Sequence, residues 1–350
     1  MTEVTEASRT YSRGAGLEHL YPGYFALVMA TGIVSTAFAQ MGFATISLAL
    51  LAVALVAYLV LAVSYVGRLV LYWDAFLVDT ADPSRAFGFF TFVAASDVLG
   101  LRLALGGQTG LFVALATVAA LAWMVCSYAL VPRVVMRPEK GTVRVEVTGA
   151  WLIWVVATQS LALAAVQGSE LWPGGRGFLD LAAVSLWSAG SCLYLLLMAI
   201  LLARLLLVPA ERQDLSPTYW INMGATAISV LAGASVLGLR GGPALVDLVA
   251  PTVAGVSVML WAFGTWWFPL LVVLTIWRAG GRAGLRRYDP SLWSVVFPLG
   301  MYSVASMALG RALDTPALAT VGKYESWLAL TAWGLTLGSM VMSWAYRRTQ

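Results

Sequence analysis

Asp97 is the residue of this sequence with the clearest chemical potential, because it interrupts an otherwise apolar stretch. It lies in Ser96-Asp97-Val98-Leu99-Gly100, about halfway along that stretch. A carboxylate in such surroundings is unfavourable unless it is paired, protonated or hydrated. Arg102 follows near the end of the stretch, so it is a poor partner on the same helix. Asp97 either forms an ion pair with another helix or faces a water-filled passage, where it could couple proton movement to the movement of another ion.

Neutral hydrogen-bond donors occur in two other apolar stretches. Thr158, Gln159 and Ser160 are consecutive in one of them, and Asn222 lies in the other. Neutral donors suit an anion that must be bound weakly enough to be released. We therefore predict anion contacts for Thr158, Gln159 and Asn222, while hydrogen bonds between packed helices explain the same residues equally well.

Glycine and proline recur at similar depths of alternate apolar stretches. Such residues either allow helices to pack closely or line a cavity in which freed carbonyl groups meet water. For a single glycine, close packing is the simpler interpretation. The recurrence at one depth favours instead a central passage walled by the odd-numbered helices. The predicted lining residues are Phe25, Gly32, Gly224, Pro298 and Gly300.

The composition indicates that helices in a lipid bilayer hold these residues. Hydrophobic residues make up 60% of the 350 residues and charged residues only 11%, and the mean hydropathy is +0.83. Water-soluble domains carry about 25% charged residues. The sequence therefore predicts an all-α integral membrane protein, with a pore domain over 20–346 between an N-terminal segment 1–19 and a C-terminal tail 347–350. Ten stretches approach or exceed the length of about 20 residues that crosses the hydrocarbon core: 20–40, 44–73, 86–105, 109–131, 148–167, 177–208, 217–238, 245–277, 291–312 and 325–346.

Lysine and arginine are distributed unevenly between the two ends of the predicted bundle. With ten spans, 16 of the 21 basic residues fall on the side that holds both termini and 5 on the other side. Short cytoplasmic loops are enriched in these residues. The distribution predicts a multi-pass protein of the inner (plasma) membrane with both termini in the cytoplasm. The residues before Leu20 include Arg9 and Arg13 but no apolar run, so we expect no cleavable signal peptide.

Several classes of protein are disfavoured by what the sequence lacks. His19 is its single histidine, and Cys126 and Cys192 sit apart in apolar stretches, which argues against a haem, a metal site or a disulfide framework. The sequence has no phosphate-binding loop and no Gly-x-Ser-x-Gly motif, and its basic residues form no patch for nucleic acid. We therefore expect no cofactor, no catalytic residue and no nucleic-acid partner. A membrane enzyme or scaffold would depend on the charged loop 139–146, whose composition is that of an ordinary solvated loop.

Three of the predicted helices begin with a proline followed three residues later by an aromatic residue. The pattern occurs at Pro22–Phe25, Pro217–Trp220 and Pro290–Trp293, and it suggests stacked helical hairpins. At these positions the sequence resembles the tellurite-resistance/dicarboxylate transporter family, which includes plant slow anion channels, fungal malate permeases and sulfite exporters. The stretches that carry the resemblance span nearly the whole chain: Tyr21–Gly32, Ser216–Ala225, Phe263–Pro269 and Tyr288–Met301.

The resemblance implies ten transmembrane helices arranged as five helical hairpins around a pseudo-fivefold central pore, in a homotrimer. It also implies that the aromatic residue before the proline of the ninth helix, here Phe297, closes the pore. An apolar ring in a narrow passage blocks hydrated anions by its bulk and by dewetting. The plant channels carry long cytoplasmic tails that this sequence lacks, so regulation through such tails is not expected.

Two related hypotheses follow from the sequence. The first is a gated anion channel or transporter for small anions such as chloride, nitrate, a dicarboxylate or sulfite. The second is a proton-coupled carrier for C4-dicarboxylates or sulfite, in which Asp97 would be the proton-coupling residue. Both require the lipid bilayer, and neither is an enzyme.

Overall fold

The computed structural model describes residues 16–348 apart from 139–145, 210, 213, 240–243 and 281–287. Most of the predicted N-terminal segment 1–19, with Arg9 and Arg13, and the greater part of the charged loop 139–146 therefore lie outside the described residues. Of the predicted tail 347–350, the structure describes only the backbone of the first two residues.

Helices form all of the regular secondary structure in the part of the chain that the structure describes, and ten helical stretches there are long and apolar enough to cross a membrane, several of them only together with the short turns that adjoin the main helix. The main helices of these stretches are α2 (Ala26–Gln40), α3 (Ala44–Leu71), α6 (Phe90–Leu105), α7 (Thr109–Val125), α10 (Ile153–Leu171), α11 (Arg176–Leu207), α12 (Ile221–Leu237), α13 (Ala244–Ala279), α14 (Trp293–Ala312) and α15 (Pro316–Arg348). Shorter helices and turns connect them: η1 (Leu17–His19), α4 (Trp73–Ala81), α5 (Pro83–Ala86), the π-helical η4 (Cys126–Leu130), α8 (Val131–Met136) and η6 (Pro173–Gly175).

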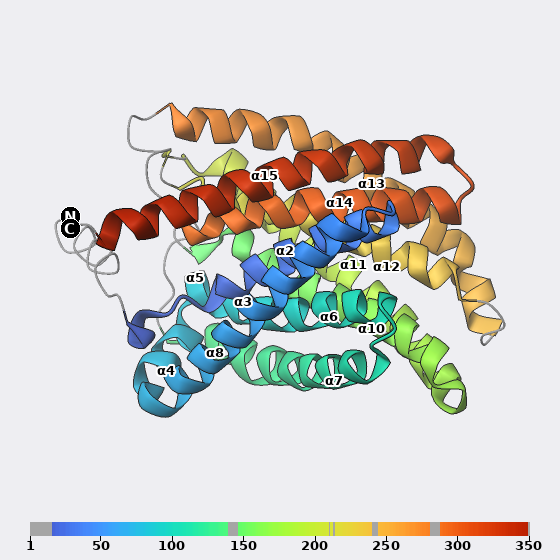
Figure 1. The fold of residues 1–350 in the computed structure, drawn as a ribbon, viewed down its shortest axis with the longest axis horizontal. Coiled ribbons are helices and arrows are strands. Elements are labelled where there is room, and N and C mark those ends of the chain that lie inside the picture. Colours follow the sequence, from blue (N-terminus) through green and yellow to red (C-terminus); the bar gives the residue numbers. More distant parts are fainter. Residues whose placement is uncertain are drawn as a thin grey trace.

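The ten long helices are arranged as helical hairpins around a closed ring. Sequential helices pack in pairs: α2 with α3, α6 with α7, α10 with α11, α12 with α13 and α14 with α15. The first helices of these pairs also contact one another in the order α2, α6, α10, α12, α14 and back to α2. We call these five helices the inner ring and their partners the outer layer. Figure 1 shows the long helices running side by side, with η1 and the end of α15 at the same end of the molecule.

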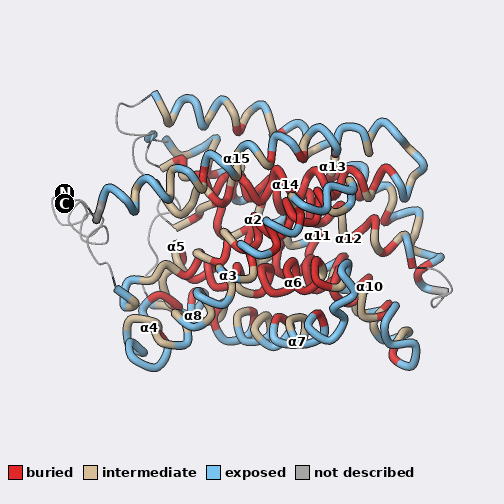
Figure 2. The backbone as a smooth tube through the Cα atoms, in the orientation of Figure 1, coloured by how far each residue is buried: buried red, intermediate tan, exposed pale blue. Residues whose placement is uncertain are grey.

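Burial separates the inner ring from the outer layer. In the most apolar stretch of each inner helix 78–89% of the residues are buried, against 11–33% in the outer helices. Figure 2 shows the buried residues concentrated along the middle of the molecule. Because the outer helices expose mainly leucine, valine and aromatic side chains, their surfaces are compatible with the hydrocarbon of a bilayer. The expected arrangement of hairpins around a ring is confirmed.

Each inner helix begins with a short 3-10 turn, and these turns form a second, smaller ring. They are η2 (Pro22–Phe25), η3 (Phe87–Phe89), η5 (Gly149–Leu152), η7 (Pro217–Trp220) and η8 (Pro290–Leu292). Each turn contacts the next, and η8 contacts η2. We call this ring the 3-10 collar. It lies at the end of the molecule that holds η1 and the end of α15.

Glycines allow the turns of the 3-10 collar to approach closely. A Cβ atom on Gly88 would lie 2.9 Å from the backbone nitrogen of Gly23, and one on Gly149 would overlap the carbonyl group of Thr218. η5 lacks a proline, and the side chain of Thr148 instead accepts a hydrogen bond from the backbone N–H of Ala150 at 3.3 Å. The sequence pattern found at three helix starts therefore marks a structural turn that occurs at all five.

The predicted spans agree with the helices except at some boundaries. The largest error concerns the last span, expected at 325–346, because α15 already begins at Pro316. The predicted boundary left Lys323 outside the last span, although this residue lies on the continuous helix α15. In the fourth span the predicted end at 131 was also wrong, because a π turn over Cys126–Leu130 leads directly into α8. Pro132 explains the wide turn, since proline cannot supply the N–H of a regular helical bond.

Candidate functional site

Phe297 lies where two helices of the inner ring meet. Its side chain is 2% exposed and projects from α14. A Cβ atom on Gly224 of α12 would lie 3.1 Å from Cε1 of Phe297 and 3.0 Å from Cγ of Pro298. The edge of the aromatic ring therefore packs directly on the backbone of the neighbouring inner helix. Pro298 also removes one backbone donor within α14, which leaves the carbonyl of Ser294 without its usual helical partner.

Two further predicted residues bring other inner helices together. A Cβ atom on Gly300 would lie 2.8 Å from Cγ2 of Ile33 on α2, and one on Gly32 would lie 3.1 Å from Cγ1 of Val98 on α6. With Gly224, these glycines mark three consecutive contacts of the inner ring, from α6 through α2 and α14 to α12. They are thus positions at which neighbouring inner helices pack closely.

Asp97 connects α6 to α10 inside the inner ring. It is fully buried, and its Oδ2 accepts a hydrogen bond from Ser160 Oγ at 2.7 Å. Its Oδ1 has no hydrogen-bond partner among the described residues, and no basic side chain there lies within ion-pairing distance. Asp97 therefore forms no ion pair with another helix in the described part of the chain. An ionised carboxylate at this position would be uncompensated.

Arg102 is held by serines rather than by Asp97. Its Nε donates to Ser35 Oγ at 2.9 Å, and a terminal guanidinium nitrogen donates to Ser47 Oγ at 2.7 Å. The two serines also bond to each other's backbone, so this group ties α6 to the α2–α3 hairpin. This cluster could not be predicted from the sequence, because the serines are distant from Arg102 in the chain.

The two predicted donors of α10 are directed to the outer layer. Trp123 on α7 donates its indole N–H to Thr158 Oγ1 at 3.0 Å. Gln159 Nε2 donates to the carbonyl oxygen of Trp187 at 3.1 Å and to Ser191 Oγ at 3.3 Å, both on α11. These are the hydrogen bonds between packed helices that the sequence left as an alternative explanation.

Asn222 and Phe25 also contact the outer layer. Asn222 Oδ1 accepts a hydrogen bond from the Tyr194 hydroxyl of α11 at 2.7 Å, while its Nδ2 has no partner among the described residues. The Phe25 ring packs against Tyr65 and Tyr58 of α3, with centroid separations of 5.2 and 5.6 Å. Of these contacts, only the free amide of Asn222 leaves a donor for a ligand.

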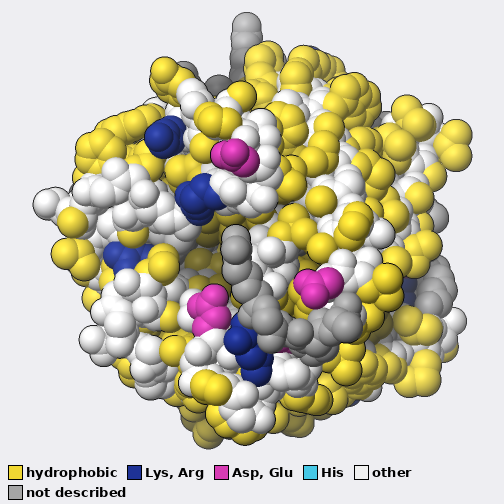
Figure 3. Space-filling view, turned by 90° about the vertical axis from the view of Figure 1, so that its right-hand side faces the viewer, with side chains coloured by type: hydrophobic (Ala, Val, Ile, Leu, Met, Phe, Trp, Pro, Cys, Tyr) yellow, Lys and Arg dark blue, Asp and Glu magenta, His cyan; other side chains and the backbone are white. Residues whose placement is uncertain are grey.

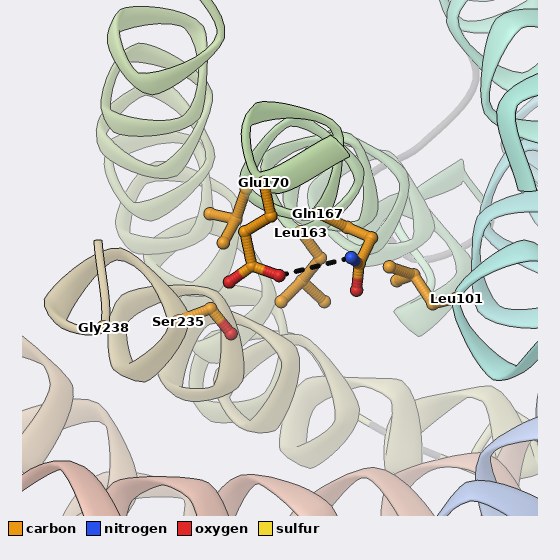
Figure 4. Close-up of a pocket in the computed structure, with 7 residues that line it drawn as sticks. Leu101, Leu163, Gln167, Glu170, Ser235 and Gly238 are labelled. Atoms are coloured by element: carbon orange, nitrogen blue, oxygen red, sulfur yellow. Dashed lines mark hydrogen bonds between the residues drawn. The ribbon is translucent and has the colours of Figure 1, made fainter. Parts of the chain in front are cut away.

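A pocket opens at the end of the inner ring opposite the 3-10 collar. It has a volume of about 270 Å³, and we call it the far pocket. Three inner helices contribute to it: α6 through Leu101, α10 through Leu163, Gln167 and Glu170, and α12 through Ser235. Gln167 Nε2 donates to Glu170 Oε2 at 3.3 Å (Figure 4). Sequence reasoning missed Gln167 and Glu170 because they fall at or beyond the predicted end of the fifth span, at 167.

The described residues contain no group of three or more histidine, cysteine or acidic side chains that could hold a metal ion. Among the described residues, the buried polar side chains of the inner ring are few and mostly neutral, and the Phe297 ring is packed between α14 and α12. Such an arrangement is suited to the passage of a small solute rather than to bond chemistry.

Comparison with known proteins identifies the group to which the chain belongs. A family model described as voltage-dependent anion channel (SLAC1) matches residues 19–341. The chain is a member of this family. Membership in the SLAC1 family agrees with the resemblance noted from the sequence, and it places the protein among membrane channels and transporters rather than enzymes.

Individual relatives are similar over different lengths. The uncharacterized membrane protein Rv1735c of Mycobacterium tuberculosis is 44% identical over 149 residues, which is 43% of this chain and 75% of that protein. The uncharacterized transporter MJ0576 of Methanocaldococcus jannaschii is 23% identical over 334 residues, 92% of each chain. The sulfite efflux pump SSU1 of Trichophyton rubrum is 24% identical over 372 residues, covering 97% of this chain and 94% of the pump.

Proposed function

We propose that this SLAC1-family protein is a gated pore that moves small inorganic or organic anions across the membrane. The observation that carries the proposal is the buried Phe297 ring, packed against Gly224 where α12 and α14 meet. In this proposal the inner ring surrounds the path and Phe297 is its gate. Chloride, nitrate, dicarboxylates and sulfite are the anions to examine, and the sulfite efflux pumps among the relatives support the inclusion of sulfite.

The physical basis of the gate is the cost of removing water from an anion. The helix ring is buried and mainly apolar around Phe297, so a hydrated anion can pass only if the aromatic ring moves aside. Neutral donors, such as the Nδ2 group of Asn222, which has no partner among the described residues, would then contact the anion without holding it tightly. A closed state is expected for the unmodified protein, and an open state when the ring is absent.

Anion flux in proteoliposomes tests the gate. Phe297→Ala should raise passive flux of chloride and nitrate well above that of the unmodified protein, because it removes the apolar ring from the path. The matched control is Phe25→Ala, since Phe25 is also fully buried but packs against Tyr65 of α3 and Phe92 of α6 rather than at the contact of α12 with α14. Either substitution is expected to cost about 3–5 kcal/mol of stability. If Phe25→Ala leaks as strongly as Phe297→Ala, the flux reflects a loosened bundle and Phe297 is not a gate.

Asp97 supports a second candidate, a proton-coupled carrier. Its carboxyl group is buried, bonded to Ser160 on one side and without a described partner on the other. If this group carries a proton during transport, Asp97→Asn should abolish the response of malate or sulfite flux to an imposed pH gradient. Ser160→Ala is the control, because it removes the hydrogen bond and keeps the carboxyl group. Flux that ignores the gradient in the unmodified protein, together with a leak in Phe297→Ala, would instead favour a channel.

We further propose that the protein lies in the plasma (inner) membrane with both termini in the cytoplasm and assembles as a homotrimer. The unequal distribution of lysine and arginine supports the orientation. The trimer is supported by the resemblance, and the apolar outer layer could accommodate such contacts as well as lipid.

A further inference from the structure

The far pocket lies where a path through the inner ring would open on the side away from the termini. Its lining comes from the ends of α6, α10 and α12 that are remote from the 3-10 collar. Gly224, which packs on Phe297, lies about three turns before Ser235 on α12. With 3.6 residues per turn, the two residues lie on the same side of the helix. The pocket and the proposed gate therefore share one face of α12.

Glu170 places a carboxylate at this opening. Its side chain is exposed, and Figure 4 shows its polar end directed toward Gln167, one turn earlier on the same helix. Gln167 Nε2 is the donor that holds it, at 3.3 Å from Oε2, whereas Ser235 Oγ donates to the Leu231 carbonyl of its own helix. The hydrogen bond orients Glu170 without neutralising its charge.

A counter-charge for Glu170 is absent from the described ion pairs. Arg176 is the nearest basic residue along the chain, and its Nε lies 3.8 Å from Asp180 Oδ2. No ion pair of Glu170 occurs in the described ranges. A carboxylate that no described basic side chain neutralises, at the mouth of an anion path, repels the ions that the path would conduct.

We propose that Glu170 is a specificity-determining residue that lowers the local concentration of anions at the far opening of the pore. This inference rests on the proposed function. A unit charge several ångströms from an ion in water changes its local concentration by roughly two- to threefold, and the factor is squared for a divalent anion. Glu170 thus disfavours dianions more than monovalent anions and disfavours their access from the far side more than from the collar side. The current through an open pore should therefore rectify.

Single-channel or macroscopic currents in planar bilayers test this inference. Phe297→Ala serves as the open background, and Phe297→Ala/Glu170→Gln is compared with it in dilute and in molar potassium chloride or potassium malate. In dilute salt, Glu170→Gln should raise chloride current from the far side about two- to threefold and malate current by more. In about 1 M salt the difference should vanish, because the screening length falls to about 3 Å.

Asp247→Asn on the same background is the matched control. Asp247 is an exposed acid at the same end of the molecule, but it belongs to the outer helix α13 and does not line the far pocket. It should leave rectification unchanged. If Phe297→Ala conducts but adding Glu170→Gln changes neither the rectification nor the malate-to-chloride current ratio, the inference about Glu170 is wrong. The proposed pore function would still stand. If Phe297→Ala conducts no anion, the proposed function fails and takes the inference with it.

Discussion

Gly224 determines how closely the Phe297 ring can approach α12. Its position would place a Cβ atom 3.0–3.1 Å from two rigid groups, the aromatic ring of Phe297 and the pyrrolidine ring of Pro298. Both groups are buried on the same segment of α14, so an added Cβ atom could be accommodated only if the ring or this segment shifts. The gate proposed above is thus a pair of residues, an aromatic ring and the glycine that receives it.

Gly224→Ala should therefore loosen the gate while keeping Phe297. The extra methyl group overpacks the interface, and a cost of about 1–3 kcal/mol is expected, together with a rise in basal anion flux as the ring is displaced. Thermal unfolding and proteoliposome flux measure the two effects. Gly334→Ala on α15 is the control, because a Cβ atom there would meet nothing within 4 Å. Unchanged stability and flux in Gly224→Ala would mean that the ring is not tightly held against α12.

At the scale of helices, the sequence predicted which segments cross the membrane better than it predicted what their polar residues contact. Length and hydropathy are sufficient to locate spans, since about 20 apolar residues are needed in every case. Boundaries were least accurate at α15, where charged residues continue a helix beyond the hydrocarbon. The proline-to-aromatic pattern marked three of the 3-10 turns. The turns η3 and η5 have no such pattern, so they are recognised only from the structure and its contacts.

The direction of each polar side chain could not be predicted in the same way. Inner helices are apolar on all sides, so no periodic pattern distinguishes the face toward the ring centre from the face toward the outer layer. Thr158 and Gln159 looked like donors for an anion, whereas tryptophan and serine residues of α7 and α11 take up their hydrogen bonds. Asp97 was recognised as buried, but its partner Ser160 depends on the contact between α6 and α10.

At the scale of the whole molecule, the two ends differ in construction. One end carries the tightly packed 3-10 collar, and the other carries the far pocket with its acidic residue. Figure 3 shows the end with the far pocket, where both basic and acidic side chains lie in the middle of the view and apolar side chains surround them. The functional meaning of this asymmetry depends on which end faces the cytoplasm. If the end with the 3-10 collar faces the cytoplasm, the proposed effect of Glu170 disfavours anion entry from outside and so favours export.

The orientation can be measured by labelling single cysteines in intact cells. Cys126 and Cys192 are first replaced by alanine, and a cysteine is then introduced at Gln108 or at Asp74, which are exposed at opposite ends of the bundle. With both termini in the cytoplasm, a membrane-impermeant maleimide should label Gln108→Cys in intact spheroplasts and Asp74→Cys only after permeabilisation. The opposite pattern would place the 3-10 collar outside and the far pocket in the cytoplasm. Glu170 would then disfavour anion export, so this result decides the direction in which the proposed rectification acts.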